Sequence, residues 1–260
     1  MAIVNVTDDS FFAGSRTPEW SAVVSRVERA VADGATVIDV GGYSSRPSAA
    51  DIPTEEEWRR VDSGLSAVRE VAPDIAVSVD TFRAEIVRRA ADKYGDFIVN
   101  DISAGEADAE MIPTVASLGL PYIAMHMRGT PQTMQSLTDY EDVVAEVRDY
   151  LAARAGYMIS QGMRRENIIL DPGFGFAKTV EQNYRLLGGL HEICALGYPV
   201  LAGMSRKSMI YRLLGITPEE SLCGTQVLNW EALRQGASIL RVHDVREAAQ
   251  TLKMYETFKR

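Results

Sequence analysis

The sequence is poor in cysteine: Cys194 and Cys223 are the only two in 260 residues, and neither has a metal-binding or redox spacing. A disulfide framework is therefore not expected, and the two lone thiols suit a reducing cytoplasm, where we expect the chain to be located. No apolar run approaches the roughly 18 residues of a membrane helix, so no membrane partner is expected. The opening MAIVNV has neither the basic segment nor the cleavage signature of a secreted protein.

An excess of basic residues is also missing. The net charge is −9, so a nucleic-acid partner is not expected. An anionic small-molecule substrate stays possible, because arginine and lysine near the site decide that question. The chain has no low-complexity tract and no long Pro/Gly/Ser linker, and its 260 residues are close to the roughly 250 of a (β/α)8 barrel. We therefore predict one domain over residues 1–260.

Eight short apolar runs, separated by helix-like stretches, each end in a polar residue that a buried strand would not choose. Strands that alternate with helices indicate a parallel sheet, and eight such units indicate an α/β protein folded as a single (β/α)8 TIM barrel. The carboxyl ends of the strands surround one site in this fold, so we expect the polar residues to gather there. The runs begin at residues 3, 36, 75, 97, 122, 168, 200 and 239.

Helix boundaries and long loops are also readable. Thr17 is the predicted N-cap of the first helix, and Thr54 and Glu57 form a predicted capping box at the start of the second. Three connections that follow strands are unusually long, which favours a functional role. The predicted helices span residues 17–33, 54–72, 139–162, 217–235 and 244–259, and the long loops span residues 7–19, 41–54 and 127–138.

Three strand ends carry groups that suit a flat, nitrogen-rich heterocycle: Asp80, Asn100 and Asp171. Any one of them could simply cap the following helix. Together, two carboxylates and an amide can donate to and accept from the edge of a ring, and a guanidine-like edge pairs with a carboxylate through two hydrogen bonds. No cluster of His and Cys accompanies them, so we interpret the three as a ring-recognition site rather than a redox site.

An anion site is predicted at the last two strands. Ser205–Ser208 opens a helix after the seventh strand, where this fold often binds phosphate, although a solvated basic turn is the alternative. Alternation places Arg241 and His243 on the same side of the eighth strand, and an arginine inside a barrel needs an anion. Asn5 is their neighbour in a closed barrel; with the acidic residues after it, it could hold a hard metal ion and phosphate, or belong to an ordinary turn.

The remaining motifs are less specific. In DPGFGF, Gly173 and Gly175 allow close backbone approach to a ligand, and one of the two phenylalanines could form a stacking wall. The segment 41–47 (GGYSSRP) is most simply an ordinary surface turn. We interpret Asp39 and His126, which also follow apolar runs, as structural residues.

The motifs NVTDDSF, GGYSSRP, SVDTF, VNDIS, MHMRGTP, ILDPGFGF, SRKS and RVHDV, in this order, closely resemble those of the dihydropteroate synthase family. These are pterin-binding TIM barrels of folate biosynthesis and the targets of sulfonamides. The resemblance runs from Ala2 to about Ala248. It implies a homodimeric, Mg2+-dependent transferase that joins 6-hydroxymethyl-7,8-dihydropterin pyrophosphate to p-aminobenzoate, giving 7,8-dihydropteroate and pyrophosphate. The C–O bond would break early, so that no protein nucleophile is needed.

The resemblance also assigns residues to each task. Catalysis would depend on Asp80, Lys207, Arg241 and His243. Asn5, Arg241 and His243 would bind the pyrophosphate, with Asn5 also next to Mg2+. The pterin pocket would comprise Asp80, Asn100, Ile102, Met125, Asp171, Phe176 and Lys207. The p-aminobenzoate site would comprise Phe11, Ser45, Arg46, Pro47, Phe176, Lys207 and Ser208.

Departures from the family pattern fall in the first two loops. Ala13 replaces an acid that can pair with the arginine of the second loop, so Arg46 needs another partner, for which Asp8 or Asp9 are candidates. The pterin site is therefore expected to be better preserved than the p-aminobenzoate site. The departures are Asp8, Phe12, Ala13, Tyr43, Ser45 and Ser48.

Three other functions remain open from the sequence. A methyltetrahydrofolate-dependent methyltransferase shares the barrel and the pterin-binding carboxylates, but it has no use for an anion site at Arg241 and His243. A class I aldolase would use Lys207 as a Schiff base. A pterin-binding relative with altered loops could bind the pterin pyrophosphate without turning it over.

Overall fold

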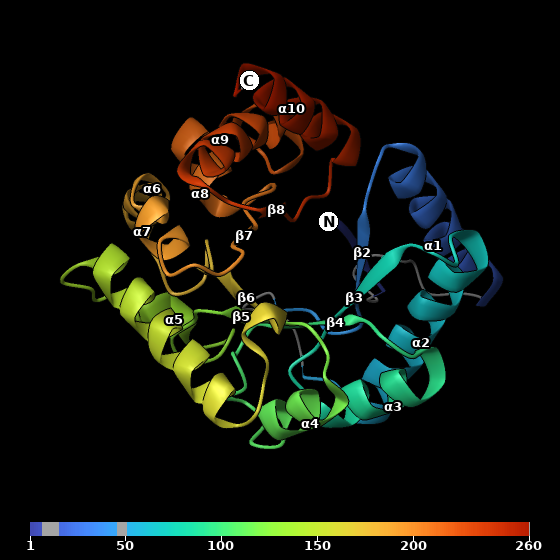
Figure 1. The fold of residues 1–260 in the computed structure, drawn as a ribbon. Helices are drawn as coiled ribbons and strands as arrows, with labels where there is room; N and C mark the ends of the chain where they lie inside the picture. The colour runs from blue at the N-terminus through green and yellow to red at the C-terminus, as the bar shows by residue number, and fades with distance from the viewer. Residues whose placement is uncertain (7–15, 46–50, 260) are drawn as a thin grey trace.

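The computed structural model describes residues 1–6, 16–45 and 51–259, with only the backbone of residues 16–19. Helices surround a central ring of parallel strands (Figure 1). The strands are β1 (Ala2–Asn5), β2 (Val37–Gly41), β3 (Ala76–Asp80), β4 (Ile98–Asp101), β5 (Tyr122–Met125), β6 (Ile168–Asp171), β7 (Leu201–Ala202) and β8 (Ile239–Leu240). The helices are α1 (Arg16–Ala32), α2 (Thr54–Val71), α3 (Ala84–Tyr94), α4 (Met111–Leu118), α5 (Val143–Ser160), α6 (Val180–Gly188), α7 (Leu190–Cys194), α8 (Ser208–Leu214), α9 (Leu222–Gln235) and α10 (Val245–Phe258).

The strands close into a barrel. β1 to β6 form one parallel sheet in chain order, and β7 pairs with β8. Single bridges join the two parts, between Leu170 and Val200 on one side and between Ala2 and Val242 on the other. The backbone N–H of Ile3 also donates to Val242 O at 3.0 Å. The predicted (β/α)8 barrel is confirmed, although its last two strands are only two residues long.

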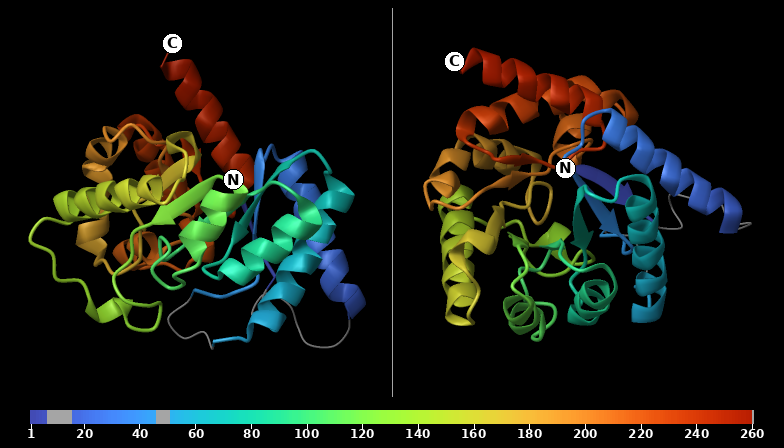
Figure 2. Two further views of the ribbon diagram at one scale, coloured as in Figure 1. Left: turned by 60° about the horizontal axis from the view of Figure 1, so that its bottom comes forward. Right: turned by 45° about the vertical axis from the view of Figure 1, so that its right-hand side comes forward.

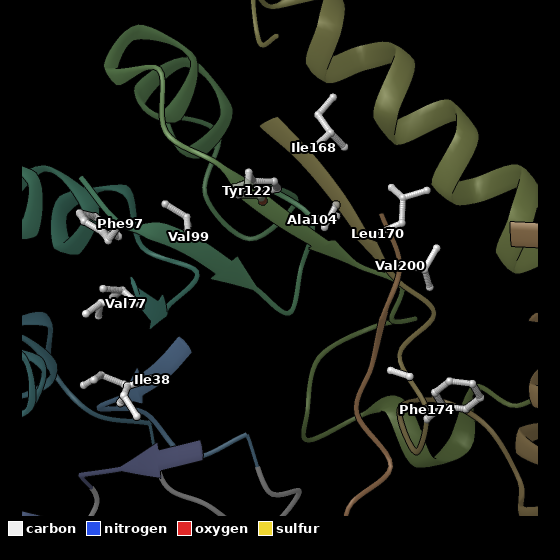
Figure 3. Close-up of a cluster of buried hydrophobic side chains, with 14 of the residues drawn as sticks. Ile38, Val77, Phe97, Val99, Ala104, Tyr122, Ile168, Leu170, Phe174 and Val200 are labelled. Atoms are coloured by element: carbon white, nitrogen blue, oxygen red, sulfur yellow. The ribbon is translucent and has the colours of Figure 1, made fainter. Parts of the chain in front are cut away.

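Side chains along each strand point alternately towards the surrounding helices and into the interior of the barrel. In β5, Tyr122 and Ala124 belong to the large cluster between strands and helices, part of which Figure 3 shows. Ile123, between them, faces inward and packs with Ile169 and Leu201 in a smaller cluster inside the barrel. Nearer the carboxyl ends, Asp39, Asp80 and Asp171 occupy inward positions, so this apolar layer lies beneath the site.

Helix boundaries were predicted less well than strands. α10 agrees with the predicted 244–259, whereas α5 begins at Val143, where the Asp142 side chain accepts from the N–H groups of Val144 and Ala145. α9 begins at Leu222, after a short 3-10 turn. No helix in the described part of the chain is both long and apolar enough to cross a bilayer.

The two predicted N-terminal caps are wrong. α1 already begins at Arg16, which places Thr17 inside the helix. At α2, the N-cap position is Pro53 and makes no side-chain hydrogen bond. Glu57 instead points into the protein, where it accepts from Thr81 Oγ1 at 2.5 Å and pairs with Arg83 Nη1 at 2.6 Å. A buried ion pair in the folded protein has taken the carboxylate that the local motif would have used.

Candidate active site

A cavity of about 910 Å³ opens at the carboxyl ends of the strands. Its wall combines the ends of β1 and β3 with the segments that follow β6, β7 and β8, as the fold predicts. Positions far apart in the sequence therefore meet in one site. The predicted residues that line it are Asn5, Ser45, Asp80, Phe176, Lys207, Ser208, Arg241 and His243.

The other predicted residues lie behind the cavity wall or outside the described residues. Ile102 and Met125 are buried in one apolar cluster, against which Phe176 packs. Asn100 and Asp171 are also buried. The predicted residues that fall outside the described part of the chain are Phe11, Arg46 and Pro47, together with the proposed partners of Arg46, Asp8 and Asp9.

A network of ion pairs lies at the floor of the cavity. Arg241 Nη2 lies 2.7 Å from Asp80 Oδ2 and 2.6 Å from Asp39 Oδ2, and its Nε donates to the same Asp39 oxygen at 2.7 Å. The Asn100 amide nitrogen lies 3.3 Å from both Asp39 oxygens. Asp39, which sequence reasoning set aside as structural, is thus the group that connects the predicted ring-binding and anion-binding residues.

Burial dominates the charge state of the carboxylates. It raises the pKa of Asp80 to about 7; Arg241 opposes this rise, and the negative charge of Asp39 adds to it. The pKa of Asp171 is also raised by burial, against the opposing charge of Lys207. Near neutral pH, Asp80 can therefore change its protonation when a ligand changes its surroundings.

Lys207 lies at the edge of the cavity beside the DPGFGF loop. Its ammonium group donates to the carbonyl oxygen of Phe174 and lies 4.6 Å from the ring centre of Phe176. Burial lowers its pKa to about 8, while the nearby charge of Asp171 works in the opposite direction. Phe174 is fully buried core, so Phe176 is the phenylalanine that lines the cavity.

His243 presents one defined ring nitrogen to the cavity. Its backbone N–H lies 3.1 Å from Ser205 Oγ, and its Nδ1 lies 3.0 Å from the same oxygen. If the serine oxygen accepts from the backbone, its own hydrogen points at Nδ1, and Nε2 carries the proton. Burial lowers the pKa of His243 to about 4, with Arg241 contributing, so the ring is neutral at pH 7. It therefore offers an anion a hydrogen bond rather than a positive charge.

Asn5 offers an oxygen ligand but not a closed metal site. The described residues contain no group of three or more His, Cys, Asp or Glu side chains that could hold a metal ion. A Cβ on Gly41 would lie 3.3 Å from Asn5 Oδ1 and 3.4 Å from Asp80 Cβ, so the missing side chain leaves room between them. Mg2+ usually binds through one or two protein oxygens together with substrate phosphates and waters, which this arrangement can accommodate.

Two further residues at the cavity were missed or undervalued by sequence reasoning. Ser205 orients His243, as described above. Tyr43 lines the cavity and packs edge-on against Phe82, with 4.9 Å between ring centres, and its ring lies 5.5 Å from the Arg83 guanidinium. The family departure at Tyr43 therefore lies at the site itself. The long loop in which it occurs and its departure from the family pattern were the two signals that pointed to this position.

His126 has the packed, hydrogen-bonded role that was predicted for it. Its Nδ1 lies 3.0 Å from Lys178 Nζ, and its ring packs edge-on against Tyr150. Lys178 also donates to the carbonyl oxygens of Gly173 and Phe176, both at 3.0 Å. This buried cluster fixes the loop that carries Phe176.

Gly173→Ala is expected to lower the free energy of unfolding by about 3 kcal/mol or more, because its Cβ would lie 2.0 Å from the backbone oxygen of His126 at a φ of +69°. Gly162→Ala is the matched control, since its φ is +93° and its Cβ would meet nothing within 4 Å. It should lose only about 1–2 kcal/mol from the backbone conformation. Urea denaturation compares the two, and equal losses would show that the contact with His126 is not limiting.

Comparison with known proteins places the chain in a family. The profile described as pterin binding enzyme matches residues 1–243. The dihydropteroate synthase of Haemophilus influenzae is 41% identical over 256 residues, covering 98% of this chain and 92% of that protein. A structure of Xanthomonas albilineans dihydropteroate synthase with 4-aminobenzoic acid superimposes with a TM-score of 0.89 at 37% identity, covering 99% and 92% of the two chains.

The chain thus has the barrel fold of the pterin-binding enzymes and belongs to that family. Within the family, the two relatives just described are dihydropteroate synthases. A second Xanthomonas albilineans structure, in complex with 7,8-dihydropteroate, has a TM-score of 0.87 at 35% identity, with 99% and 92% coverage.

Proposed function

We propose that this chain condenses 6-hydroxymethyl-7,8-dihydropterin pyrophosphate with p-aminobenzoate, giving 7,8-dihydropteroate and pyrophosphate. The observation that carries the proposal is the meeting of two kinds of group in one cavity. Asp80, a carboxylate that suits the ring, lies in direct contact with Arg241, which suits the leaving group. A methyltransferase that uses the same pterin-binding carboxylates would have no need for this second group.

The ring would bind at the floor of the cavity. Asp80, Asp171 and the amide oxygen of Asn100 would supply acceptors for the N–H groups of the nitrogen-rich edge, and carboxylates pair well with such edges. Ile102 and Met125 would form the apolar wall, with Phe176 and Lys207 at its rim. All these groups are held by short strands or by buried contacts, so the pocket is pre-organised.

The pyrophosphate would lie towards Arg241, His243 and Asn5. Arginine supplies the permanent charge, and the neutral His243 supplies a hydrogen bond from Nε2. Mg2+ would be held by Asn5 together with phosphate oxygens; when bound, such an ion neutralises negative charge on the leaving group. These groups stabilise the electron pair that leaves with the pyrophosphate when the C–O bond breaks.

Bond cleavage leaves a cation that is delocalised into the pterin. An anionic Asp80 beside the ring stabilises this cation, and the neutral aniline nitrogen of p-aminobenzoate then attacks the exocyclic carbon and loses a proton. Ser45, Ser208, Lys207 and Phe176 would form the p-aminobenzoate site, with Phe11, Arg46 and Pro47 of the loops. No serine or cysteine nucleophile is required.

We also propose that the chain forms a homodimer, that residues 1–260 form a single domain, and that the protein is located in the cytoplasm. The dimer is supported by exposed apolar side chains on α9 and α10, and Figure 2 shows α10 (red) at the edge of the molecule. Val227 is 62% exposed, Met254 66% and Phe258 80%. Sedimentation velocity of the purified chain tests this point. The free thiols of Cys194 and Cys223 support a reducing location.

The test of the main proposal is pyrophosphate release with both substrates and Mg2+. Release should depend on p-aminobenzoate, and 7,8-dihydropteroate should appear in equal amount. Binding of the pterin pyrophosphate without any p-aminobenzoate-dependent release would indicate a pterin-binding protein without turnover, and would contradict the proposal. Borohydride trapping with a carbonyl substrate separates the aldolase alternative, and we expect no adduct at Lys207.

A further inference from the structure

We propose that Asp39 is a positioning residue, which holds Arg241 and Asn100 in the orientations in which they meet the leaving group and the ring. The inference rests on the function proposed above and assigns a role to a residue that the resemblance does not include. Asp39 itself lies below the substrate pockets, in β2, and is 0% exposed.

The position of Asp39 is set by the strand. Asp39 and Gly41 lie two residues apart and face the same side of β2, towards the barrel interior. Gly41 is directly beside Asn5 and Asp80, as the distances to its missing Cβ show. Asp39 therefore lies one layer below the cavity, where its contacts are with the site residues rather than with a bound molecule.

Asp39 keeps Arg241 paired in every state of the site. One guanidinium group is shared by two carboxylates, with Nε and Nη2 directed at Asp39 and Nη2 also close to Asp80. When Asp80 turns to hydrogen-bond donors of the ring, Arg241 would be a buried charge with no carboxylate in direct contact if Asp39 were absent. Such a charge is strongly unfavourable, so the Arg241 side chain would move. With Asp39 present it stays in place.

The contact with Asp39 leaves the Nη1 group of Arg241 available to a ligand. Nη1 has no hydrogen-bond partner among the residues that the structure describes, whereas Nε and Nη2 are engaged. Arg241 lines the cavity, so Nη1 is the donor it can offer to an anion there. Asp39 thereby determines which edge of the guanidinium group meets the pyrophosphate.

Asp39 also determines how Asn100 is turned. An ionised carboxylate only accepts hydrogen bonds, so it can face the NH2 group of Asn100 but not its oxygen. In the structure, Asn100 Nδ2 lies 3.3 Å from both Asp39 oxygens, so the NH2 group faces the carboxylate. The amide oxygen is then left to accept from an N–H of the ring.

The test is Asp39→Asn, which conserves the shape but removes the charge and one acceptor. Its NH2 group would oppose that of Asn100, and Arg241 would shift to Asp80, the carboxylate that the ring needs. We expect the KM for the pterin pyrophosphate to rise about tenfold or more, in line with the loss of a charge-assisted hydrogen bond. The KM for p-aminobenzoate should stay within about twofold, since no contact of Asp39 reaches that site.

Asp101→Asn is the matched control for burial. Asp101 is equally buried, but it accepts from the Tyr122 hydroxyl and from the backbone N–H groups of Ser103 and Gly105, not from Arg241. This variant should lower the thermal midpoint and leave the ratio of the two KM values unchanged. If Asp39 only stabilised the fold, Asp39→Asn would behave in the same way.

Calorimetry without turnover separates this inference from the proposed function. The probes are 6-hydroxymethylpterin alone and inorganic pyrophosphate with Mg2+. If the unmodified protein binds neither, the site assignment itself fails. If it binds both and Asp39→Asn binds them equally well, the role of Asp39 is overturned whatever its thermal midpoint. In an Arg241→Gln background, Asp39→Asn should cause no further loss of pyrophosphate affinity.

A second variant covers the case in which Asp39→Asn does not fold. Asp39→Glu keeps the counter-charge and should therefore fold, but its longer side chain displaces Arg241 and Asn100. We expect weaker binding of both probes, by about threefold to tenfold each. Unchanged binding of both by folded Asp39→Glu would also overturn the proposal.

Discussion

Asp80→Asn is expected to lower kcat about 100-fold or more, the range seen when an electrostatic contact to the transition state is removed. Asparagine has the size of aspartate and can still accept a hydrogen bond from the ring. It lacks the negative charge that would stabilise a cation delocalised into the pterin. The effect should therefore appear in kcat, while the KM for the pterin pyrophosphate changes much less.

The fold of this variant should stay intact, because Arg241 keeps Asp39 as its counter-ion. Burial raises the pKa of Asp80 from its ordinary 3.8 to about 7, so ionisation of this group disfavours the folded state. That penalty is absent below about pH 4 and complete above about pH 7. The stability of Asp80→Asn relative to the unmodified protein should thus increase across this interval, as thermal denaturation at several pH values would reveal.

Asp74→Asn is the control for loss of one negative charge near the same strand. Asp74 is exposed and precedes β3, at the end opposite to the site. Its kcat should equal that of the unmodified protein. A near-normal kcat for Asp80→Asn would show that the carboxylate charge is not used in the reaction.

The barrel and the location of its site could be predicted because both depend on short-range patterns. Each strand needs only a run of apolar residues, and the polar residue at its end marks the carboxyl side. Asp80 ends one strand, and Lys207 and Arg241 follow two others, so the closed topology alone placed the three in one cavity. No knowledge of their pairwise contacts was required.

The contacts inside the site could not be predicted in the same way. Asp39 and Arg241 are 202 positions apart, and nothing local to either identifies the other as its partner. A buried acid in the middle of a strand does signal that a counter-ion is needed, since an unpaired buried charge is strongly unfavourable. Asp39 is such a buried acid. It was nevertheless interpreted as a structural residue, because burial alone does not identify the counter-ion.

The helix caps failed for a related reason. The pattern Thr54 to Glu57 satisfies the local rule for a capping box, but Glu57 is bound by Thr81 and Arg83 from the segment that joins β3 to α3. A local hydrogen bond contributes about 1 kcal/mol and is lost when a buried ion pair competes for the same carboxylate. The local rule for a capping box therefore failed at Glu57 because a distant group competed for its carboxylate.

Replacement of Lys207 by an uncharged residue is the other substitution with a large expected effect. Lys207→Met should lower kcat/KM for the pterin pyrophosphate about 10- to 100-fold, the loss expected for a hydrogen bond from a charged donor. The ammonium group at the rim of the pterin pocket disappears, and the carbonyl oxygen of Phe174 loses its donor. Steady-state kinetics with saturating p-aminobenzoate measures the effect.

The pH dependence identifies the group responsible. Burial lowers the pKa of Lys207 to about 8, so the free enzyme loses this charge as the pH rises through 8. The profile of kcat/KM should fall on the alkaline side near pH 8 and on the acid side near pH 7, where Asp80 becomes protonated. Lys207→Arg keeps its charge throughout this range, so its alkaline limb should vanish even if its maximal rate is lower. An alkaline limb that persists in Lys207→Arg would assign this ionisation to a different group, and Lys207 would then act by shape and hydrogen bonding rather than by charge.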